Sequence, residues 1–115
     1  MSVIIWHNPR CSKSRLTLQL LENNGEIPTV VEYLKTPPSA SEINEVLLKL
    51  GCTPREAIRK GEQPYKVNDL EDDKKSRNDL LNAMAENPIL IERPIVIKGD
   101  KAAIGRPPES VLEIL

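Results

Sequence analysis

The stretch "VIIWHNPRCSKSRL", residues 3–16, decides the fold, because an apolar run leads through a polar loop into a helix. "VIIW" (3–6) is apolar at every position, which is typical of a strand buried inside a sheet. The pattern after the loop predicts a helix from about Ser12 to Asn24, closed by Gly25. We expect its apolar side to carry Leu16, Leu18, Leu20 and Leu21.

"TVVEY" (29–33) is predicted to be a second strand. The predicted helix crosses between it and the first strand, so the two strands should be parallel. Near the other end of the chain, "PIVIK" (94–98), a turn at Gly99-Asp100 and "KAAIG" (101–105) predict an antiparallel hairpin. Pro107 and Pro108 then open a last helix, whose inward side is expected to carry Val111, Leu112 and Leu115.

The middle of the chain, about 36–88, is predicted to be helical. Ser39 and Glu42 form a capping box before a periodic apolar run that Gly51 ends. Thr53 and Pro54 open a short helix that Arg59 is expected to end, and residues 66–76 are predicted to be a solvated loop or short helix. Another helix follows Ser76 and should bury Leu80, Leu81, Met84 and Ala85.

The order of elements therefore predicts an α/β fold with a mixed four-stranded sheet. We expect a single domain over residues 1–115, with the helical stretch inserted between the second and third strands.

The composition excludes several function classes. The formal net charge is −1, which gives no general attraction to nucleic acid. No apolar run is long enough for a membrane span, and no signal peptide is visible, so a cytoplasmic location is expected. Cys11, Cys52 and a single histidine lack zinc-ligand spacing, so no metal is expected.

Cys11 lies in the loop between the first predicted strand and the first predicted helix. This loop follows the carboxyl end of a strand, where α/β sheets tend to bind ligands. N–H groups of the first helical turn, the neighbouring Arg10, Lys13 and Arg15, and a folded-back His7 would all favour the thiolate. The same N–H groups would hold an oxyanion. Cys11 to Ser14 is a CxxS version of the CxxC redox motif, so an external thiol would have to complete a two-electron reaction.

The Cys11 loop has other interpretations. Cys11 is alternatively a partly buried cysteine in a loop without chemistry. A phosphatase loop would need an arginine six residues after the cysteine, and Thr17 occupies that position, so this spacing fails. Cys52 is expected to be a small core residue, with a resolving thiol as its alternative, and Trp6, Tyr33 and Tyr65 are expected to pack in the core.

Two distant arginines should approach the Cys11 loop. Arg93 precedes Pro94 at the start of the third strand, where the peptide bond could be cis, and Arg106 precedes Pro107 at the last helix. If the sheet forms as predicted, both flank adjacent strand ends, and their guanidinium groups suit a tetrahedral oxyanion. The alternative for these arginines, and more so for Arg59, is an ordinary solvated surface residue.

Five segments together resemble the glutaredoxin-coupled arsenate reductase family, most nearly its short bacterial YfgD-type members. They are "HNPRCSKSR" (7–15), "YLKTPP" (33–38), "IRKGEQPY" (58–65), "NPILIERPIVIK" (87–98) and "IGRPPESVLEIL" (104–115). Each segment alone is only weakly specific for the family, but their order and spacing together are specific. The resemblance covers essentially the whole chain. The resemblance implies a thioredoxin-like fold of the glutaredoxin type with a helical insertion.

The resemblance also implies a reaction and its residues. Cys11 would attack arsenate and form a covalent thiol–arsenic adduct, helped by His7 and Ser14. The oxyanion would be bound by three arginines, Arg59, Arg93 and Arg106. Glutathione would act as the reducing co-substrate and glutaredoxin would take the mixed disulfide, with no bound cofactor. Pro94 would match the family's cis-proline.

Two alternatives of the same fold remain open at this point. One is a glutathione-dependent thiol oxidoreductase that acts on mixed disulfides. The other is a transcriptional regulator of the Spx kind, which binds RNA polymerase. Spx proteins usually carry CxxC as a redox switch, whereas this chain has CxxS at 11–14.

Overall fold

The computed structural model describes residues 2–115. They form two compact units: one runs up to Thr36 and resumes at Arg93–Leu115, and the other is Pro37–Glu92. Each unit is described by itself. That the whole chain acts as one domain with an insertion stays a prediction.

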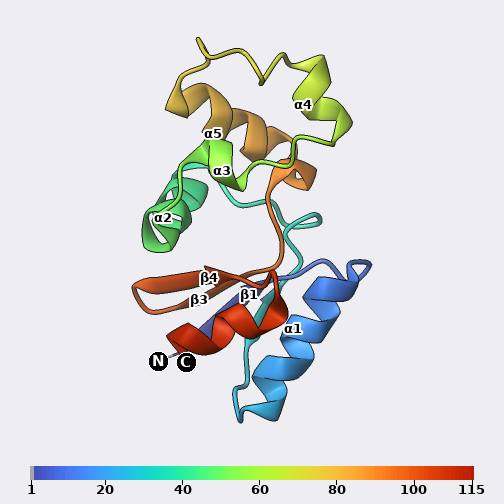
Figure 1. The fold of residues 1–115 in the computed structure, drawn as a ribbon, viewed down its shortest axis with the longest axis vertical. Helices are drawn as coiled ribbons and strands as arrows, with labels where there is room; N and C mark the ends of the chain where they lie inside the picture. The colour runs from blue at the N-terminus through green and yellow to red at the C-terminus, as the bar shows by residue number, and fades with distance from the viewer. Residues whose placement is uncertain (1) are drawn as a thin grey trace. The chain divides into compact units, whose positions relative to one another are not determined.

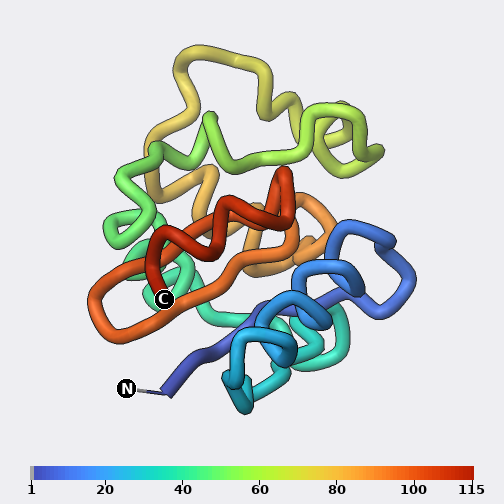
Figure 2. The backbone as a smooth tube through the Cα atoms, turned by 60° about the horizontal axis from the view of Figure 1, so that its bottom comes forward, coloured from blue at the N-terminus to red at the C-terminus, as the bar shows by residue number. Residues whose placement is uncertain are grey.

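The first unit is a mixed sheet of four strands in the order β2-β1-β3-β4 (Figure 1). The strands are β1 (Val3–Trp6), β2 (Thr29–Val31), β3 (Ile95–Lys98) and β4 (Lys101–Ile104). β1 pairs with β2 in parallel, and it pairs with β3 antiparallel, so that Ile5 faces Val30 on one side and Val96 on the other. Figure 2 shows the strands from the two ends of the chain side by side. The predicted parallel pair, hairpin and mixed sheet are confirmed.

β2 is shorter than predicted because it ends at Val31 rather than at Tyr33. The N–H groups of Lys35 and Thr36 both donate to the Glu32 carbonyl, so the chain turns there instead of extending the strand. Tyr33 is 1% exposed, so its predicted role as a packing residue is confirmed although it lies outside the strand.

The core of this unit combines strand residues with α1 (Ser12–Asn23) and the 3₁₀ helix η2 (Pro108–Ile114). Fully buried Val3, Ile5, Leu21, Val96 and Val111 form its centre, and Leu18, Leu20, Ala103 and Ile114 pack against them.

The prediction that Leu16 faces inward is wrong, since its side chain is 56% exposed. The buried face of α1 carries Ser14, Thr17 and Leu21, which follow one another at helical spacing. Leu16 is two positions beyond Ser14, which turns it about 200° around the helix and away from that face. The buried face could not be recognised from the spacing of apolar residues, because two of its residues, Ser14 and Thr17, are polar.

The prediction for the last helix is also corrected. Leu112 is 40% and Leu115 36% exposed, whereas Val111 and Ile114 face the core. The segment is a 3₁₀ helix rather than an α-helix, so residues three apart lie on the same side. Residues 108, 111 and 114 therefore share one face, and Leu112 falls off it.

The second unit contains only helical elements and one isolated bridge among its described residues. The helices are α2 (Ala40–Leu50), α3 (Pro54–Ala57), α4 (Gln63–Val67) and α5 (Arg77–Glu86), followed by the 3₁₀ turn η1 (Pro88–Leu90). The predicted capping box at Ser39, the predicted N-cap at Thr53 and the predicted end of α2 at Gly51 are confirmed. Thr53 and Ser76 also form complete capping boxes, and Gly51 is in the left-handed conformation.

Two details of this unit differ from the sequence prediction, and one agrees with it. α3 ends at Ala57, because Ile58 leaves the helix to form an antiparallel bridge with Ile91, so Arg59 lies beyond the helix. The predicted solvated loop or short helix over 66–76 is confirmed, because this stretch holds the end of α4 followed by a loop. On α5 the buried alanine is Ala83 rather than Ala85.

Within the described residues, no helix is both long and apolar enough to cross a membrane.

Candidate active site

The loop between β1 and α1 is held by its own hydrogen bonds. The Cys11 N–H donates to the Asn8 carbonyl at 3.0 Å, and the Arg10 N–H donates to the Asn8 side-chain oxygen at 3.0 Å. The Arg15 guanidinium reaches back and donates to the Pro9 carbonyl at 2.9 Å. These three bonds fix the turn that presents Cys11 at the start of the helix.

His7 and Ser14 form a buried pair beneath this loop. The His7 Nδ1 lies 2.6 Å from the Ser14 hydroxyl oxygen, which also accepts the Asn8 N–H at 3.0 Å. His7 is 7% exposed and Ser14 is fully buried. The pair ties the end of β1 to the first turn of α1, on either side of the cysteine.

Burial lowers the pKa of His7, and the charge of Arg15 lowers it further, while Glu32 opposes the shift. The imidazole is therefore more readily neutral than an exposed one. A neutral ring accepts a hydrogen bond from the Ser14 hydroxyl or donates one to it, depending on its tautomer.

Cys11 is the N-cap residue of α1, and its side chain is partly exposed. Its side chain makes no capping hydrogen bond, but as the N-cap residue it lies at the positive end of the helix dipole, which favours a thiolate. This is the helix-start position that the sequence predicted for the thiol.

The pKa of the Cys11 thiol is lowered although burial, the largest single influence, raises it. The Ser14 N–H, the Arg93 charge, the Lys13 N–H and the Arg106 charge, in that order, outweigh the burial. The sulfur is thus ionised at a lower pH than an ordinary thiol, and the thiolate is the nucleophilic form.

Arg106 connects the cysteine to the hairpin. Its Nη2 lies 4.0 Å from the Cys11 sulfur, and its Nε donates to the Arg93 carbonyl at 2.9 Å. The structure thus brings together five predicted site residues, His7, Cys11, Ser14, Arg93 and Arg106.

Two prolines accompany these arginines. The Arg93-Pro94 peptide bond is cis, as predicted. The Arg106-Pro107 bond is also cis, which was not predicted.

The side chains of Arg10, Lys13 and Arg15, which the sequence suggested, are not among the groups that lower the pKa of Cys11. The cationic side chains that do so come from residues 93 and 106, far along the chain, and Lys13 acts through its backbone N–H. Arg15 is engaged with the Pro9 carbonyl instead.

Arg59 belongs to the second unit. Its Nη2 lies 3.1 Å from a Glu62 carboxylate oxygen, and its backbone N–H donates to the Leu90 carbonyl at 2.7 Å. Its assignment to oxyanion binding stays a prediction.

Cys52, also in the second unit, is partly exposed rather than buried in the core. Burial and the nearby Glu56 raise the pKa of its thiol. It therefore favours the neutral thiol, in contrast to Cys11.

Sequence reasoning missed several residues of the site. Gly105 lies against Thr17 of α1, and Asn8 bonds to the Ser14 hydroxyl and to the Cys11 N–H. The only available signal was the glycine in "IGRPP", because a glycine beside an arginine and two prolines suggests a close approach.

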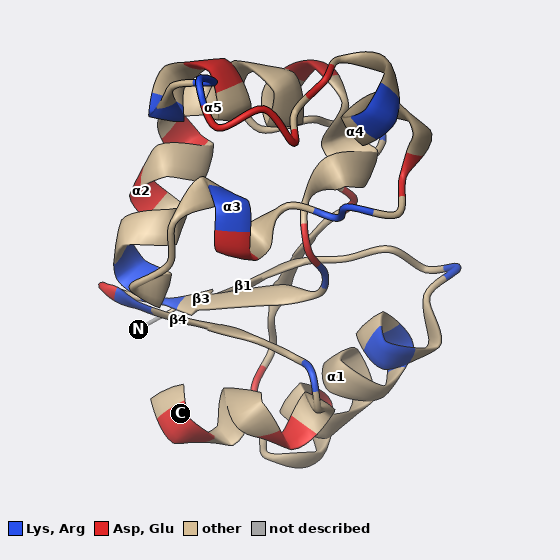
Figure 3. Cartoon of the chain, turned by 45° about the horizontal axis from the view of Figure 1, so that its top comes forward, with Lys and Arg blue, Asp and Glu red and all other residues tan. Residues whose placement is uncertain are grey.

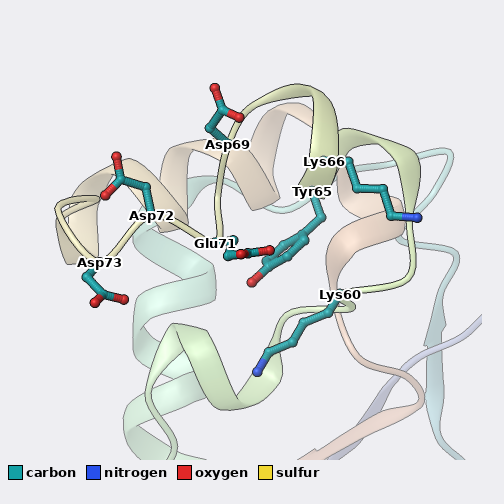
Figure 4. Close-up of a pocket in the computed structure, with 7 residues that line it drawn as sticks. All are labelled: Lys60, Tyr65, Lys66, Asp69, Glu71, Asp72 and Asp73. Atoms are coloured by element: carbon teal, nitrogen blue, oxygen red, sulfur yellow. The ribbon is translucent and has the colours of Figure 1, made fainter.

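A hollow of about 990 Å³ lies in the second unit. Lys60, Lys66 and Tyr65 line it together with a run of acidic residues in the loop after α4 (Figure 3). The Asp69, Asp72 and Asp73 carboxylates point away from the Tyr65 ring (Figure 4), as on an ordinary solvated surface. None of the predicted site residues lines it. The described residues contain no cluster of three or more metal-ligating side chains.

The arrangement around Cys11 supplies a thiolate nucleophile, helix N–H groups and a nearby cationic group. That combination suits attack on the central atom of a small oxyanion, because fixed positive charge offsets the repulsion between two anions.

Comparison with known proteins identifies the family. The sequence profile of the ArsC family matches residues 6–114. The chain is 53% identical over 114 residues to "Uncharacterized protein YfgD" of Escherichia coli K12, covering 98% of this chain and 96% of that protein. It is 52% identical over 116 residues to an "Arsenate reductase" of Haemophilus influenzae, with both chains covered completely.

A solved structure agrees with these relatives. The "Arsenate reductase from Vibrio cholerae" superposes with a TM-score of 0.97 at 52% identity, covering 100% of this chain and 98% of that one. The predicted thioredoxin-like fold and the predicted family are thereby confirmed. The chain belongs to the ArsC family.

Proposed function

We propose that the protein is an arsenate reductase that uses Cys11 as its nucleophile and draws its electrons from glutathione and glutaredoxin. The names of the H. influenzae and V. cholerae relatives support the arsenate substrate. The contact of 4.0 Å between Arg106 Nη2 and the Cys11 sulfur is the observation on which the proposal chiefly rests.

Arsenate is a tetrahedral anion near neutral pH, and it would bind where Arg93, Arg106 and the helix N–H groups converge on Cys11. Arg59 is proposed as a third binding arginine on the strength of the sequence resemblance. The partly exposed position of Cys11 gives the anion access to the sulfur.

In the first step the Cys11 thiolate attacks the arsenic atom. A sulfur–arsenic bond forms, an oxygen leaves as water after taking up protons, and arsenic remains in its pentavalent state. Arg93 and Arg106 offset the repulsion between the thiolate and the oxyanion. His7 and Ser14 hold the loop that aims the sulfur.

Glutathione then supplies the second sulfur. Its thiolate attacks the Cys11 sulfur, a disulfide forms, and the electron pair of the broken sulfur–arsenic bond stays on arsenic, which leaves as trivalent arsenite. The CxxS motif at 11–14 offers no partner thiol within the motif, which supports an external resolving thiol. Glutaredoxin would take the glutathionyl group and restore the Cys11 thiolate.

We also propose that residues 1–115 act as one domain. We further propose that the protein is located in the cytoplasm, where glutathione keeps thiols reduced. The family match over residues 6–114 supports a single functional unit that includes the helical stretch.

A coupled assay with purified protein, glutathione, glutaredoxin and arsenate tests the proposal. Arsenate-dependent oxidation of glutathione is expected, and Cys11→Ser should abolish it while Cys52→Ser retains it. No arsenate-dependent rate above background with both thiol partners present would reject the proposed function. Activity on glutathionylated peptides without arsenate reduction would favour the general thiol oxidoreductase instead.

A further inference from the structure

Gly105 is a buried glycine between β4 and Arg106. Among the described glycines, Gly25, Gly51 and Gly99 have the positive φ that favours glycine, and Gly105 is not one of them. Its backbone conformation therefore does not require a glycine. The atoms packed around residue 105 explain why it is a glycine.

The space around Gly105 leaves no room for a side chain. A Cβ atom there would overlap the Thr17 hydroxyl oxygen, and it would lie 2.8 Å from the Pro94 Cγ and 3.1 Å from the Thr17 Cγ2. Neither neighbour yields readily. Thr17 is fully buried with its hydroxyl bonded to the Lys13 carbonyl at 2.8 Å, and Pro94 is a buried rigid ring.

Three segments of the candidate site meet at this glycine. Thr17 lies on α1, the helix that Cys11 begins. The Gly105 N–H donates to the Pro94 carbonyl at 2.9 Å, next to Arg93. The following residue, Arg106, donates to the Arg93 carbonyl and reaches towards the Cys11 sulfur.

We propose that Gly105 is a positioning residue, whose missing side chain lets α1 and the Arg93-Pro94 segment approach closely enough for Arg106 to face Cys11. The inference deepens the proposed function and rests on it for the role of the oxyanion. A side chain at this position would act as a wedge between α1 and the end of β4. Because Cys11 is on one side of the wedge and Arg106 on the other, their separation would grow and their electrostatic interaction would weaken.

The test is the ultraviolet titration of the Cys11 thiolate in a Cys52→Ser background, so that one sulfur gives the signal. With Gly105→Ala we expect the pKa of Cys11 to rise towards the ordinary thiol value, because a stabilising cation moves away. In the coupled assay the KM for arsenate should rise and kcat/KM should fall, by about 10²-fold for a displacement near 1 Å. Circular dichroism and a thermal melt establish that the variant is folded.

Gly61→Ala is the matched control. It is also a glycine without positive φ, and a Cβ there would meet no atom within 4 Å, so it should leave the pKa of Cys11 unchanged. Thr17→Ala combined with Gly105→Ala removes two of the three overlapping contacts and should return the pKa part of the way to that of the parent. If Gly105 had a purely structural role, Gly105→Ala would lower the melting temperature, but the pKa of Cys11 would not rise in it and return in the double variant.

Several outcomes would overturn the proposal. A folded Gly105→Ala that titrates like the parent contradicts it, as does a double variant that shows no rescue. Should Gly105→Ala fail to fold, the double variant is compared with Thr17→Ala alone. The remaining Pro94 contact predicts a higher Cys11 pKa in the double variant, and equal values would contradict the proposal. The titration needs no arsenate, so a pKa shift without any arsenate turnover would keep the role of Gly105 and reject the proposed function.

Discussion

The guanidinium of Arg106 lies 4.0 Å from the sulfur of Cys11, although 95 positions separate the two residues in the chain. The hairpin of β3 and β4 creates this proximity, because it returns the chain to the edge where β1 ends. The same guanidinium is oriented by its hydrogen bond to the Arg93 carbonyl. The arginine therefore acts on the sulfur from a fixed direction rather than as a mobile surface charge.

Arg106→Ala should weaken both thiolate formation and turnover. Loss of the positive charge raises the pKa of Cys11, and loss of one donor to a developing anion typically lowers turnover by about 10²–10³-fold. Arg106→Lys restores the charge but not the two-pronged contact with the Arg93 carbonyl and the sulfur, so it should recover the pKa better than the rate. Steady-state kinetics and alkylation rates against pH measure the two effects. Equal activity of Arg106→Ala and the parent would contradict the assignment.

Ser14→Ala should destabilise the folded protein. The hydroxyl bonds to His7 Nδ1 and to the Asn8 N–H in a buried setting, and loss of one partner of a buried polar group costs about 1–3 kcal/mol. Urea denaturation measures the change in the free energy of unfolding. Ser12→Ala is the matched control on the exposed side of the same helical turn, and it should change stability little. Similar losses in the two variants would show that the His7–Ser14 pair does not stabilise the loop.

Leu21→Ala and Leu16→Ala should differ sharply in stability. Leu21 is completely buried in the core of the first unit, and a buried leucine truncated to alanine costs about 2–5 kcal/mol. Leu16 is 56% exposed on the same helix, and its truncation should fall within about 0.5 kcal/mol. Thermal or urea unfolding measures both. A larger loss from Leu16→Ala would mean that the face of α1 is assigned incorrectly.

The ionisation of Cys11 should make stability depend on pH. The pKa of this thiol is lower in the folded protein than in the unfolded chain, so the folded state binds fewer protons between those two values. The contribution of Cys11 to the free energy of unfolding is fully present above the pKa of the thiol in the unfolded chain, about 8.5. It is lost as the pH falls through the lower pKa of the thiol in the folded protein. The free energy of unfolding of the parent minus that of Cys11→Ser should therefore increase with pH across this window. A difference that stays flat, or that decreases, would contradict a stabilised thiolate.

The sheet and the capping boxes could be predicted because their signals are local. Apolar strands, the Gly99-Asp100 turn and Ser39 with Glu42 determine their elements through neighbours in the sequence. The buried face of α1 could not be found in this way. Its Ser14 and Thr17 are polar, and their burial depends on His7 and Gly105, which come from other segments.

The candidate site was predictable in part. The position of Cys11 at the helix start follows from the strand, loop and helix pattern. The first-turn N–H groups and the approach of Arg93 and Arg106 were also predicted, whereas the adjacent Arg10 and Arg15, which the sequence equally suggested, are not among the groups that lower the pKa of Cys11.

The titration of the Cys11 thiolate in Cys52→Ser protein, with and without arsenate, tests the central claim most directly. The account predicts a midpoint below the ordinary thiol value of about 8.5. Arsenate should move that midpoint, because the anion binds against the sulfur, and it should move it far less in Arg106→Ala. A midpoint at the ordinary value, or a curve that arsenate leaves unchanged, would contradict a thiolate poised to attack the oxyanion.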